Sequence, residues 1–476
     1  MPAPAYDIVQ KLWNLCHVLR DDGVVYQKYV TELVYLLFLK MAKETGREDR
    51  HLPKGYRWDD LTAREGIAQL TFYKSLLLHL GTEGSPRVQT IFGDAATALR
   101  KPQSLSKLVE AIDAIDWFSK EREQIGELYE GLLEKNAGEV KSGAGQYFTP
   151  RPLVDAMVDV VKPRAGEILQ DPACGTAGFL IHADHYIKAA TEGLFTLSES
   201  AAEFQRTRAY VGVELVPETM RLAQMNLLLH DIQSEVQNGD TLTSLGAGLP
   251  KADLILTNPP FGTKQGGQKP SRDDFTYPTS NKQIAFLQHI YRGLKPGGRA
   301  AVVLPDNVLF EDNVGVEVRR DLMEKCDLHT VLRLPTGIFY AQGVKTNVLF
   351  FSRGSTDTGN TKRVWFYDYR TNVPAFGKRT PLTRAHFDDF VRLYGDDPRG
   401  GSPREDQGES GRWRVFTREE VARRGDNLDI TWLKDESAGH HEELAEPEVI
   451  AAGIAESLET ALREIRGLQE ALGVEA

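Results

Sequence analysis

The chain has 476 residues, and its 68 acidic and 57 basic side chains give a formal net charge of −11, so its surface as a whole repels polyanions such as nucleic acid. Its three cysteines, Cys16, Cys174 and Cys326, are too widely spaced for a disulfide framework or a Cys-x-x-Cys zinc site, and we expect no metal centre. The longest apolar run near the N-terminus, "LVYLLFL", is far shorter than the roughly 20 residues that cross a bilayer, and Asp7 interrupts any signal-peptide pattern, so we expect a cytoplasmic protein.

Residues 1–140 have the pattern of helices. Apolar residues recur at intervals of three and four in "YDIVQKLWNLCHVLRDD" (6–22), "YQKYVTELVYLLFLKMAKE" (26–44) and "KEREQIGELYEGLLEKNA" (120–137). This spacing places apolar side chains on one face of a helix. We therefore predict an all-α N-terminal domain over 1–140.

The pattern changes between residues 145 and 355, where short runs rich in β-branched residues alternate with helical stretches. The seven runs are "GEILQ", "AYVGVE", "EVQNGD", "ADLILTN", "RAAVVLP", "HTVLRLP" and "TNVLFFS". Strands that alternate with helices favour a doubly wound α/β sheet, in which ligands bind beyond the carboxyl ends of the strands. We predict a catalytic domain over 141–370 that contains a seven-stranded sheet.

The remaining residues are predicted to form a C-terminal extension in two parts. Residues 371–440 contain a charged, glycine-rich stretch, "GDDPRGGSPREDQGESGR" (395–412), which is typical of a flexible loop or linker. Residues 441–476 contain an apolar seam at three- and four-residue spacing, which predicts an association helix. The seam consists of Ile450, Ile454, Leu458, Leu462, Ile465, Leu468 and Leu472. It is a candidate docking surface for a partner helix, and folding back onto its own chain is the alternative.

A glycine-rich turn, "LQDPACGTAGFLI" (169–181), follows the first predicted strand and opens a helix. Gly175 and Gly178 allow a ligand to approach the backbone, and a helix N-terminus favours a carboxylate or phosphate nearby. The turn lacks the GxxxxGK[ST] pattern of nucleoside triphosphatases. Asp171 is a candidate partner for an ammonium group, whereas a tight turn without a ligand is the alternative. The cofactor-binding candidates in this turn are Asp171, Ala173, Gly175, Thr176, Gly178 and Phe179.

The next two predicted strands also end near acidic residues. "AYVGVE" ends at Glu214, where such folds place a carboxylate that accepts hydrogen bonds from two ribose hydroxyls, although the spacing from the turn is longer than usual. "NGD" places Asp240 beside the same crevice, where it is a candidate acceptor for the amino group of an adenine. A solvated glutamate is the alternative for Glu214.

The fourth predicted strand runs into "TNPPFG" (257–262). Pro259 and Pro260 have no backbone N–H group and a restricted φ, so they stop the strand and stiffen the loop. A stiff loop holds the Asn258 amide, the Pro259 carbonyl and the Phe261 ring in a fixed arrangement. The alternative, a strand stop followed by a core phenylalanine, is weakened because polar groups lie at four successive strand ends.

These groups suit methyl transfer from a sulfonium donor to an exocyclic amine. The adenine amine is a poor nucleophile because its lone pair is delocalised, and acceptors on Asn258 and Pro259 would localise that lone pair in the transition state. Phe261 would stack on a base flipped out of a duplex. No Pro-Cys dipeptide occurs, which argues against attack on a cytosine carbon, and we interpret Cys174 as a packing residue.

The segment after this tetrapeptide, "GTKQGGQKPSRDDF" (262–275), is rich in glycine and basic residues. Lys264, Lys269 and Arg272 are candidates for contacts to DNA phosphates at the mouth of the site. A merely solvated loop is the alternative.

Several motifs together resemble the modification (M) subunit of type I restriction-modification systems, an adenine-N6 DNA methyltransferase. They are "GQYFTP" (145–150), "DPACGTAGFL", "NPPFG", "GVKTNVLFF" and "RGDNLDI", in the order of the family, and the resemblance covers nearly the whole chain. It implies a class I S-adenosylmethionine-dependent methyltransferase fold, with S-adenosyl-L-methionine as cofactor and double-stranded DNA as substrate. It also implies a cofactor role for Gln146, Phe148 and Thr149. Without the resemblance, the first motif is a turn in which Thr149 caps the next helix.

The resemblance implies partners as well: a specificity (S) subunit and a restriction (R) subunit, with two M subunits for each S subunit. Roughly 120 residues follow the last predicted strand, which is little room for a module that reads a long DNA target. The alternatives are a stand-alone DNA adenine methyltransferase, an RNA or protein-glutamine methyltransferase with the same Asn-Pro-Pro-Phe chemistry, and a non-catalytic scaffold. The long helical N-terminal region favours DNA modification, and the intact Asp171, Glu214, Asn258 and Phe261 argue against a scaffold.

Overall fold

The computed structural model describes residues 3–24, 28–115, 117, 129–133, 149–234, 236–261, 270, 272–339, 344–374, 376–377 and 380–434. The described residues up to Thr431 belong to one compact unit. Several expectations fall wholly or mostly outside these ranges: the helix at 120–137, the cofactor role of Gln146 and Phe148, the phosphate contacts of Lys264 and Lys269, and the association helix at 441–476. Among the residues that are described, no helix is both long and apolar enough to cross a membrane.

The described residues between 3 and 115 form helices. These are α1 (Ala3–Asn14), α2 (Cys16–Asp21), α3 (Tyr29–Glu44), α4 (Glu48–His51), α5 (Trp58–Thr62), α6 (Gly66–Glu83), α7 (Pro86–Phe92) and α8 (Pro102–Asp113). Both α7 and α8 begin with proline, whose missing N–H group costs nothing in the first helical turn. Nearly every residue of α3 is buried, so this helix is the centre of the N-terminal core.

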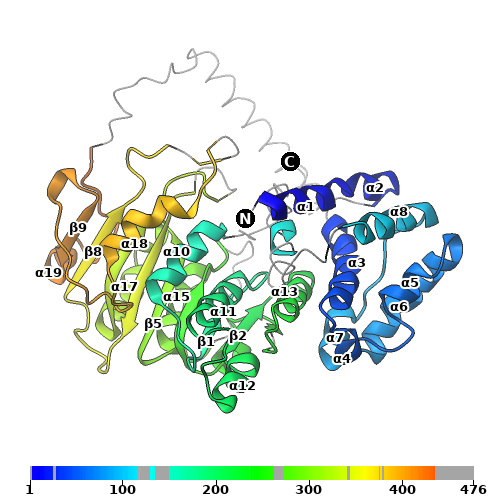
Figure 1. The fold of residues 1–476 in the computed structure, drawn as a ribbon. Helices are drawn as coiled ribbons and strands as arrows, with labels where there is room; N and C mark the ends of the chain where they lie inside the picture. Colours follow the sequence, from blue (N-terminus) through cyan, green and yellow to red (C-terminus); the bar gives the residue numbers. More distant parts are fainter. Residues whose placement is uncertain are drawn as a thin grey trace, which may run out of the picture. The chain divides into compact units, whose positions relative to one another are not determined.

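The N-terminal core extends onto α13 (Pro217–Leu229), which lies between the sheet and the N-terminal helices (Figure 1). The residues of α13 that share this core are Met225, Leu228 and Leu229. Arg47 donates a hydrogen bond to the Leu229 carbonyl at 3.0 Å, and Arg87 donates to the Ser234 carbonyl at 3.1 Å. Since α13 follows the second strand of the sheet, the helical region supports an element next to the predicted crevice.

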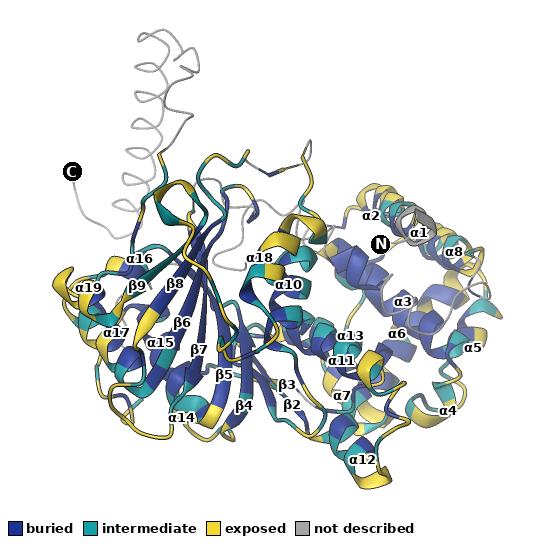
Figure 2. Ribbon diagram, turned by 60° about the vertical axis from the view of Figure 1, so that its left-hand side comes forward, coloured by how far each residue is buried: buried dark blue, intermediate teal, exposed yellow. Residues whose placement is uncertain are grey.

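A nine-stranded sheet has the order β3-β2-β1-β4-β5-β7-β6-β8-β9. Figure 2 shows most of the sheet in the dark blue of buried residues. The strands are β1 (Leu169–Asp171), β2 (Tyr210–Glu214), β3 (Val236–Asn238), β4 (Ala252–Thr257), β5 (Leu294–Pro305), β6 (Cys326–Arg333), β7 (Thr346–Arg353), β8 (Arg363–Asp368) and β9 (Trp413–Thr417). The seven predicted runs coincide with β1 to β7. The chain reverses its direction of travel across the sheet between β1 and β4, the kind of point at which doubly wound sheets bind ligands.

The predicted number of seven strands is wrong, because β8 and β9 continue the sheet beyond β6. β8 is parallel to β6, with Arg333 opposite Asp368, and β9 is antiparallel to β8. β9 follows the charged stretch 395–412, and contacts with a distant strand, more than its own short sequence, decide that it joins the sheet. The domain boundaries at 140, 370 and 440 stay predictions.

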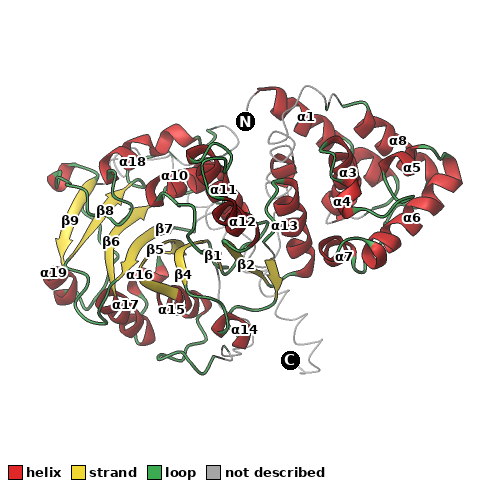
Figure 3. Cartoon of the chain, turned by 60° about the horizontal axis from the view of Figure 1, so that its bottom comes forward, coloured by secondary structure: helices red, strands yellow, loops and turns green. Residues whose placement is uncertain are grey.

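Helices cover both faces of the sheet (Figure 3). One layer contains α10 (Arg151–Val161), α11 (Gly178–Ala190), α13 and α18 (Asp388–Tyr394), and the other contains α15 (Lys282–Gly293), α16 (Asn307–Phe310) and α17 (Val314–Lys325). The shorter elements are α12 (Glu199–Thr207), α14 (Ser244–Ala247), α19 (Arg418–Arg423), η2 (Arg384–Phe387) and η3 (Gly408–Ser410). Because both faces are covered, the strands read as nearly continuous apolar runs.

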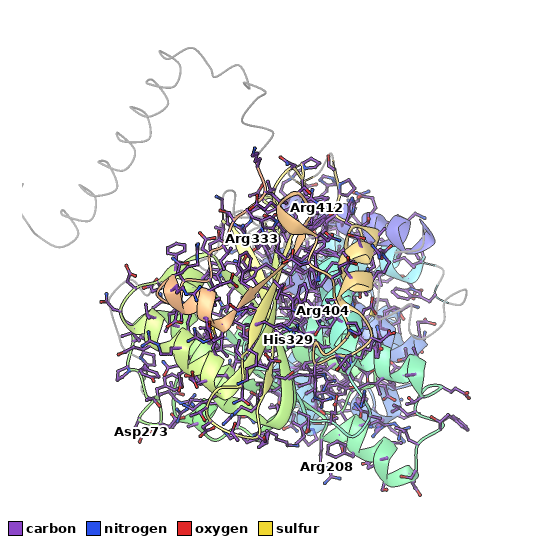
Figure 4. The ribbon with its side chains drawn as sticks, turned by 90° about the vertical axis from the view of Figure 1, so that its left-hand side faces the viewer. Arg208, Asp273, His329, Arg333, Arg404 and Arg412 are labelled. Carbon is purple, nitrogen blue, oxygen red and sulfur yellow. The ribbon has the colours of Figure 1, made fainter. Side chains whose placement is uncertain are left out.

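The charged stretch 395–412 is a loop apart from the short η3, and Arg404 attaches it to the sheet. Its guanidinium donates to the Thr330 hydroxyl on β6 at 2.9 Å and lies over the Tyr394 ring, 4.4 Å from the centroid. In Figure 4 Arg404 lies well below Arg333, the last residue of β6, so Arg404 attaches the loop away from the carboxyl end of this strand. Contrary to the prediction of a flexible linker, the part of this loop around Arg404 is packed.

Candidate active site

The carboxyl ends of four parallel strands bring the predicted polar residues to one edge of the sheet. β3, β2, β1 and β4 are neighbours in that order, and each adjacent pair is parallel. β1 ends at Asp171, β2 ends at Glu214, and Asn258 directly follows β4. Asp240 lies two residues beyond the end of β3. The fold therefore places the residues predicted from the sequence along a single edge.

The glycine-rich turn connects β1 to α11. Gly175 has φ +54° and Ala177 has φ +68°, so the chain makes two left-handed steps before the helix begins at Gly178. A Cβ atom built on Gly175 or Gly178 would have no other atom within 4 Å. The backbone at these two glycines therefore borders open space, which suits the close approach of a ligand.

Glu214 is bound to the turn by its carboxylate. Its two oxygens accept hydrogen bonds from the Gly175 N–H at 3.0 Å and the Val216 N–H at 2.8 Å. Burial raises the pKa of Glu214, and these backbone hydrogen bonds oppose that rise. Each carboxylate oxygen can accept more than one hydrogen bond, so this arrangement leaves capacity for a ligand hydroxyl.

Asp171 lies underneath the same turn. It is 1% exposed, and one of its oxygens accepts a hydrogen bond from the Ala173 N–H at 3.1 Å. Burial raises the pKa of Asp171 to about 7, and the nearby charge of Glu214 acts in the same direction. A cation beside this carboxyl would stabilise its ionised form.

The turn after β3 packs against the turn after β1. An Asp240 side-chain oxygen accepts a hydrogen bond from the Leu242 N–H at 2.8 Å, and the Thr241 hydroxyl donates to the Pro172 carbonyl at 2.6 Å. The Leu242 side chain belongs to a small apolar cluster against which Ala173 packs. Thr241 was not predicted from the sequence, because a threonine beside an aspartate is common in turns.

Arg272 is also part of this region, and its predicted contact with DNA phosphates is wrong. Its side chain is 3% exposed and pairs with Asp274, at 2.6 and 2.7 Å. A further N–H donates to the Thr241 carbonyl at 2.9 Å. Lys264 and Lys269, the other two candidates for phosphate contacts, lie outside the described residues.

Asn258 is joined to the segment that precedes α10. Its side-chain nitrogen donates a hydrogen bond to the Thr149 hydroxyl at 3.0 Å. Pro259 is buried, and Pro260 is partly buried. Two predicted groups, one from the motif at 145–150 and one from the tetrapeptide, therefore meet at the same sheet edge.

Phe261 is partly buried and packs on the apolar core beside the sheet. Its ring lies edge-to-face with Phe339, with centroids 5.9 Å apart and planes at 73°. Phe339 was not predicted from the sequence, although it lies four residues before the motif "GVKTNVLFF". In the described part of the chain, no group of three or more His, Cys, Asp or Glu side chains could hold a metal ion.

Comparison with known proteins identifies the family. Residues 120–441 match the family described as N-6 DNA Methylase. The chain is 51% identical to the type I restriction enzyme StySPI methylase subunit of Salmonella potsdam, over 98% of this chain and 95% of that protein. It is 50% identical, over the same shares of both proteins, to the EcoKI methylase subunit of Escherichia coli strain K12.

Solved structures agree with these sequence matches. The crystal structure of the type I restriction enzyme EcoKI M protein is 47% identical with a TM-score of 0.59, covering 98% of this chain and 97% of that chain. A chain from a study of complex assembly in the type I R-M system is 28% identical with a TM-score of 0.72, covering 98% of both. The chain therefore belongs to the N-6 DNA methylases, as an S-adenosylmethionine-dependent adenine methyltransferase that is the modification subunit of a type I restriction-modification system.

Proposed function

We propose that this methyltransferase acts on an adenine flipped out of double-stranded DNA, with Asn258, Pro259, Pro260 and Phe261 as its catalytic residues. The observation that carries the proposal is the hydrogen bond from Asn258 to Thr149 at 3.0 Å. This hydrogen bond lies at the sheet edge where β1 ends at Asp171 and β2 ends at Glu214. This edge combines groups suited to a cofactor with groups suited to an amine.

The chemistry follows from the acceptors on the tetrapeptide. The side-chain oxygen of Asn258 and the carbonyl of Pro259 accept the two hydrogens of the adenine amine, which localises the nitrogen lone pair. These two acceptors would keep the lone pair directed at the electrophilic methyl group that S-adenosyl-L-methionine supplies when bound, and the proton displaced from the nitrogen would pass to water. Phe261 stacks on the base and offsets the stacking that flipping removes. Asn258 is neutral and positions the amine without acting as a strong base.

We assign the cofactor to the sheet edge beside the glycine-rich turn. The assigned residues are Gln146, Phe148, Thr149, Asp171, Ala173, Gly175, Thr176, Gly178, Phe179, Glu214 and Asp240. S-adenosyl-L-methionine supplies an electrophilic methyl group when bound. The chemistry of the described residues fits it: Glu214 has acceptor capacity for ribose hydroxyls, and an ammonium group would compensate the buried carboxyl of Asp171.

We further propose that this chain works in the cytoplasm with partners. A specificity (S) subunit would read the DNA sequence, two copies of this chain would flank one S subunit, and a restriction (R) subunit would join them. The net charge of −11 supports a requirement for partners in DNA binding, because non-specific DNA affinity comes mainly from cationic contacts with phosphates. The three cysteines are free and buried, which suits a reducing compartment.

Labelled S-adenosylmethionine tests the proposed function directly. The full chain is incubated with genomic DNA, with and without a purified specificity (S) subunit. We expect label on adenine N6 of duplex DNA only when the S subunit is present. Efficient methylation of a defined sequence by the chain alone would indicate a stand-alone DNA enzyme. Label on RNA or on a protein glutamine would contradict the proposed substrate.

A further inference from the structure

Arg370 lies just beyond β8, one of the two strands that the sequence did not predict. Its guanidinium is mostly buried and donates to both carboxylate oxygens of Asp306, at 2.7 and 2.8 Å. Asp306 directly follows β5, and β7 and β6 lie between β5 and β8 in the sheet. Although burial raises the pKa of Asp306, the pairing with Arg370 holds it below its ordinary value. One arginine thus joins two strand ends across two intervening strands.

The same guanidinium holds both ends of the connection between β6 and β7. It donates to the Leu334 carbonyl, directly after β6, at 2.9 Å, and to the Thr346 carbonyl, at the start of β7, at 2.7 Å. The Asn347 side chain adds a hydrogen bond to Asp306 at 2.7 Å. Arginine can serve these acceptors together because its five N–H donors form a rigid planar fork.

This connection carries Phe339, whose ring contacts Phe261 edge-to-face. Phe339 is 3% exposed, so its side chain has little freedom to move. The chain after β8 packs against the connection at a second point, because a Cβ atom on Gly337 would lie 2.4 Å from the Phe376 carbonyl. The Phe376 N–H also donates to the Thr336 carbonyl at 3.3 Å. Residues beyond β8 therefore determine where Phe339 sits.

We propose that Arg370 is a positioning residue for the target adenine. By fixing Leu334 it holds the described segment 334–339 that presents Phe339, and Phe339 in turn orients the Phe261 ring. A stacking platform must lie parallel to the base, so a small tilt of the ring moves the amine away from its acceptors. Arg370 itself touches neither the base nor the methyl donor. This inference rests on the stacking role proposed for Phe261.

A double-mutant cycle between Arg370 and Phe261 tests the inference, with the full chain in its active complex on DNA. Arg370→Gln should lower turnover about tenfold or more, while the affinity for S-adenosylmethionine changes less than about twofold. In a Phe261→Ala background the same change should have little further effect, because the ring that it orients is gone. Arg370→Lys keeps the charge but loses the fork, so it should restore only part of the turnover.

Arg404→Gln is the matched control, because it removes another partly buried guanidinium that binds β6 through Thr330 and not through the β6–β7 connection. It should lower the melting temperature but leave turnover unchanged at a common assay temperature. The inference is overturned if Arg370→Gln lowers turnover equally in both Phe261 backgrounds, or if Arg404→Gln lowers it as much. Wild-type turnover in Phe261→Ala would overturn the stacking role itself, and the inference with it, which separates the two kinds of failure.

Discussion

Asn258 and Thr149 are 109 positions apart in the chain, yet the Asn258 side-chain nitrogen donates a hydrogen bond to the Thr149 hydroxyl at 3.0 Å. An amide carries its donor and its acceptor in one plane, so a fixed nitrogen also fixes the direction of the oxygen. Thr149 belongs to the motif assigned to the cofactor, and Asn258 to the tetrapeptide assigned to the amine. The hydrogen bond therefore fixes the position of the proposed amine-binding tetrapeptide relative to the proposed cofactor-binding motif.

Asn258→Ala is expected to lower turnover by about two orders of magnitude or more, because it removes an acceptor that acts in the transition state. Affinity for S-adenosylmethionine should stay nearly unchanged, since the proposed cofactor contacts remain. Thr149→Val removes only the hydroxyl that orients the amide, so its effect on turnover should be smaller. Labelled methyl transfer and calorimetry measure the two quantities. Wild-type turnover in purified Asn258→Ala protein would sink the catalytic assignment.

Glu214→Ala is expected to weaken cofactor binding by about 1 to 3 kcal/mol, with a smaller effect on turnover at saturating cofactor. The loss has two sources: the proposed ribose contact and the hydrogen bond that holds the Gly175 N–H at 3.0 Å. Glu214→Gln keeps the shape and one acceptor oxygen, so it should lie between the wild type and the alanine variant. If calorimetry finds the same affinity in all three proteins, Glu214 is not a cofactor residue.

The stability of the cofactor-free protein should depend on pH through Asp171. Burial raises its pKa from 3.8 to about 7, so between these values the folded state keeps a proton that the unfolded state releases. The free energy of unfolding therefore falls as pH rises through this window, by at most about 1.4 kcal/mol per pH unit, and this contribution is constant above it. Asp171→Asn cannot ionise and should lack this contribution.

Thermal melting of the wild type and Asp171→Asn across this pH range checks the expectation. The difference between the two melting temperatures should change from about pH 4 to about pH 7 and then stay constant. Saturating S-adenosylmethionine should reduce the change if its ammonium group lies beside Asp171. Parallel melting curves at every pH would mean that Asp171 does not titrate in this window.

Phe261→Ala should lower turnover, whereas Phe261→Tyr and Phe261→Trp should keep most of it, because both retain an aromatic face for the flipped base. Melting temperatures are measured beside turnover, since Phe261 also packs on the core beside the sheet. Equal losses of turnover in all three variants, with equal losses of stability, would identify the ring as a core residue.

Removing the chain from Glu448 onward should abolish assembly with the S subunit, because it deletes the predicted apolar seam that begins at Ile450. Binding of S-adenosylmethionine should persist, since the assigned residues all precede the cut. Size-exclusion chromatography with the purified S subunit measures assembly, and calorimetry measures the cofactor. A truncated chain that still forms the complex would place the docking surface elsewhere.

The sequence by itself determined the local features of this protein. The periods of apolar residues located β1 to β7, because burial on both faces requires continuous apolar strands. Gly175 and the two prolines, Pro259 and Pro260, marked the turns, because their backbone restrictions act within a few residues. Asp171 and Glu214 could be predicted as site residues because each ends a strand, and parallel strands end at one edge of the sheet.

Only the tertiary structure decided which distant groups meet. In the sequence Arg272 looks like part of a basic loop, yet its side chain turns inward to Asp274 and the Thr241 carbonyl. The same holds for Arg370, whose partners come from three other strand ends. The physical reason is that long-range packing and charge pairing, rather than local backbone preference, select whether a long basic side chain is buried or solvated.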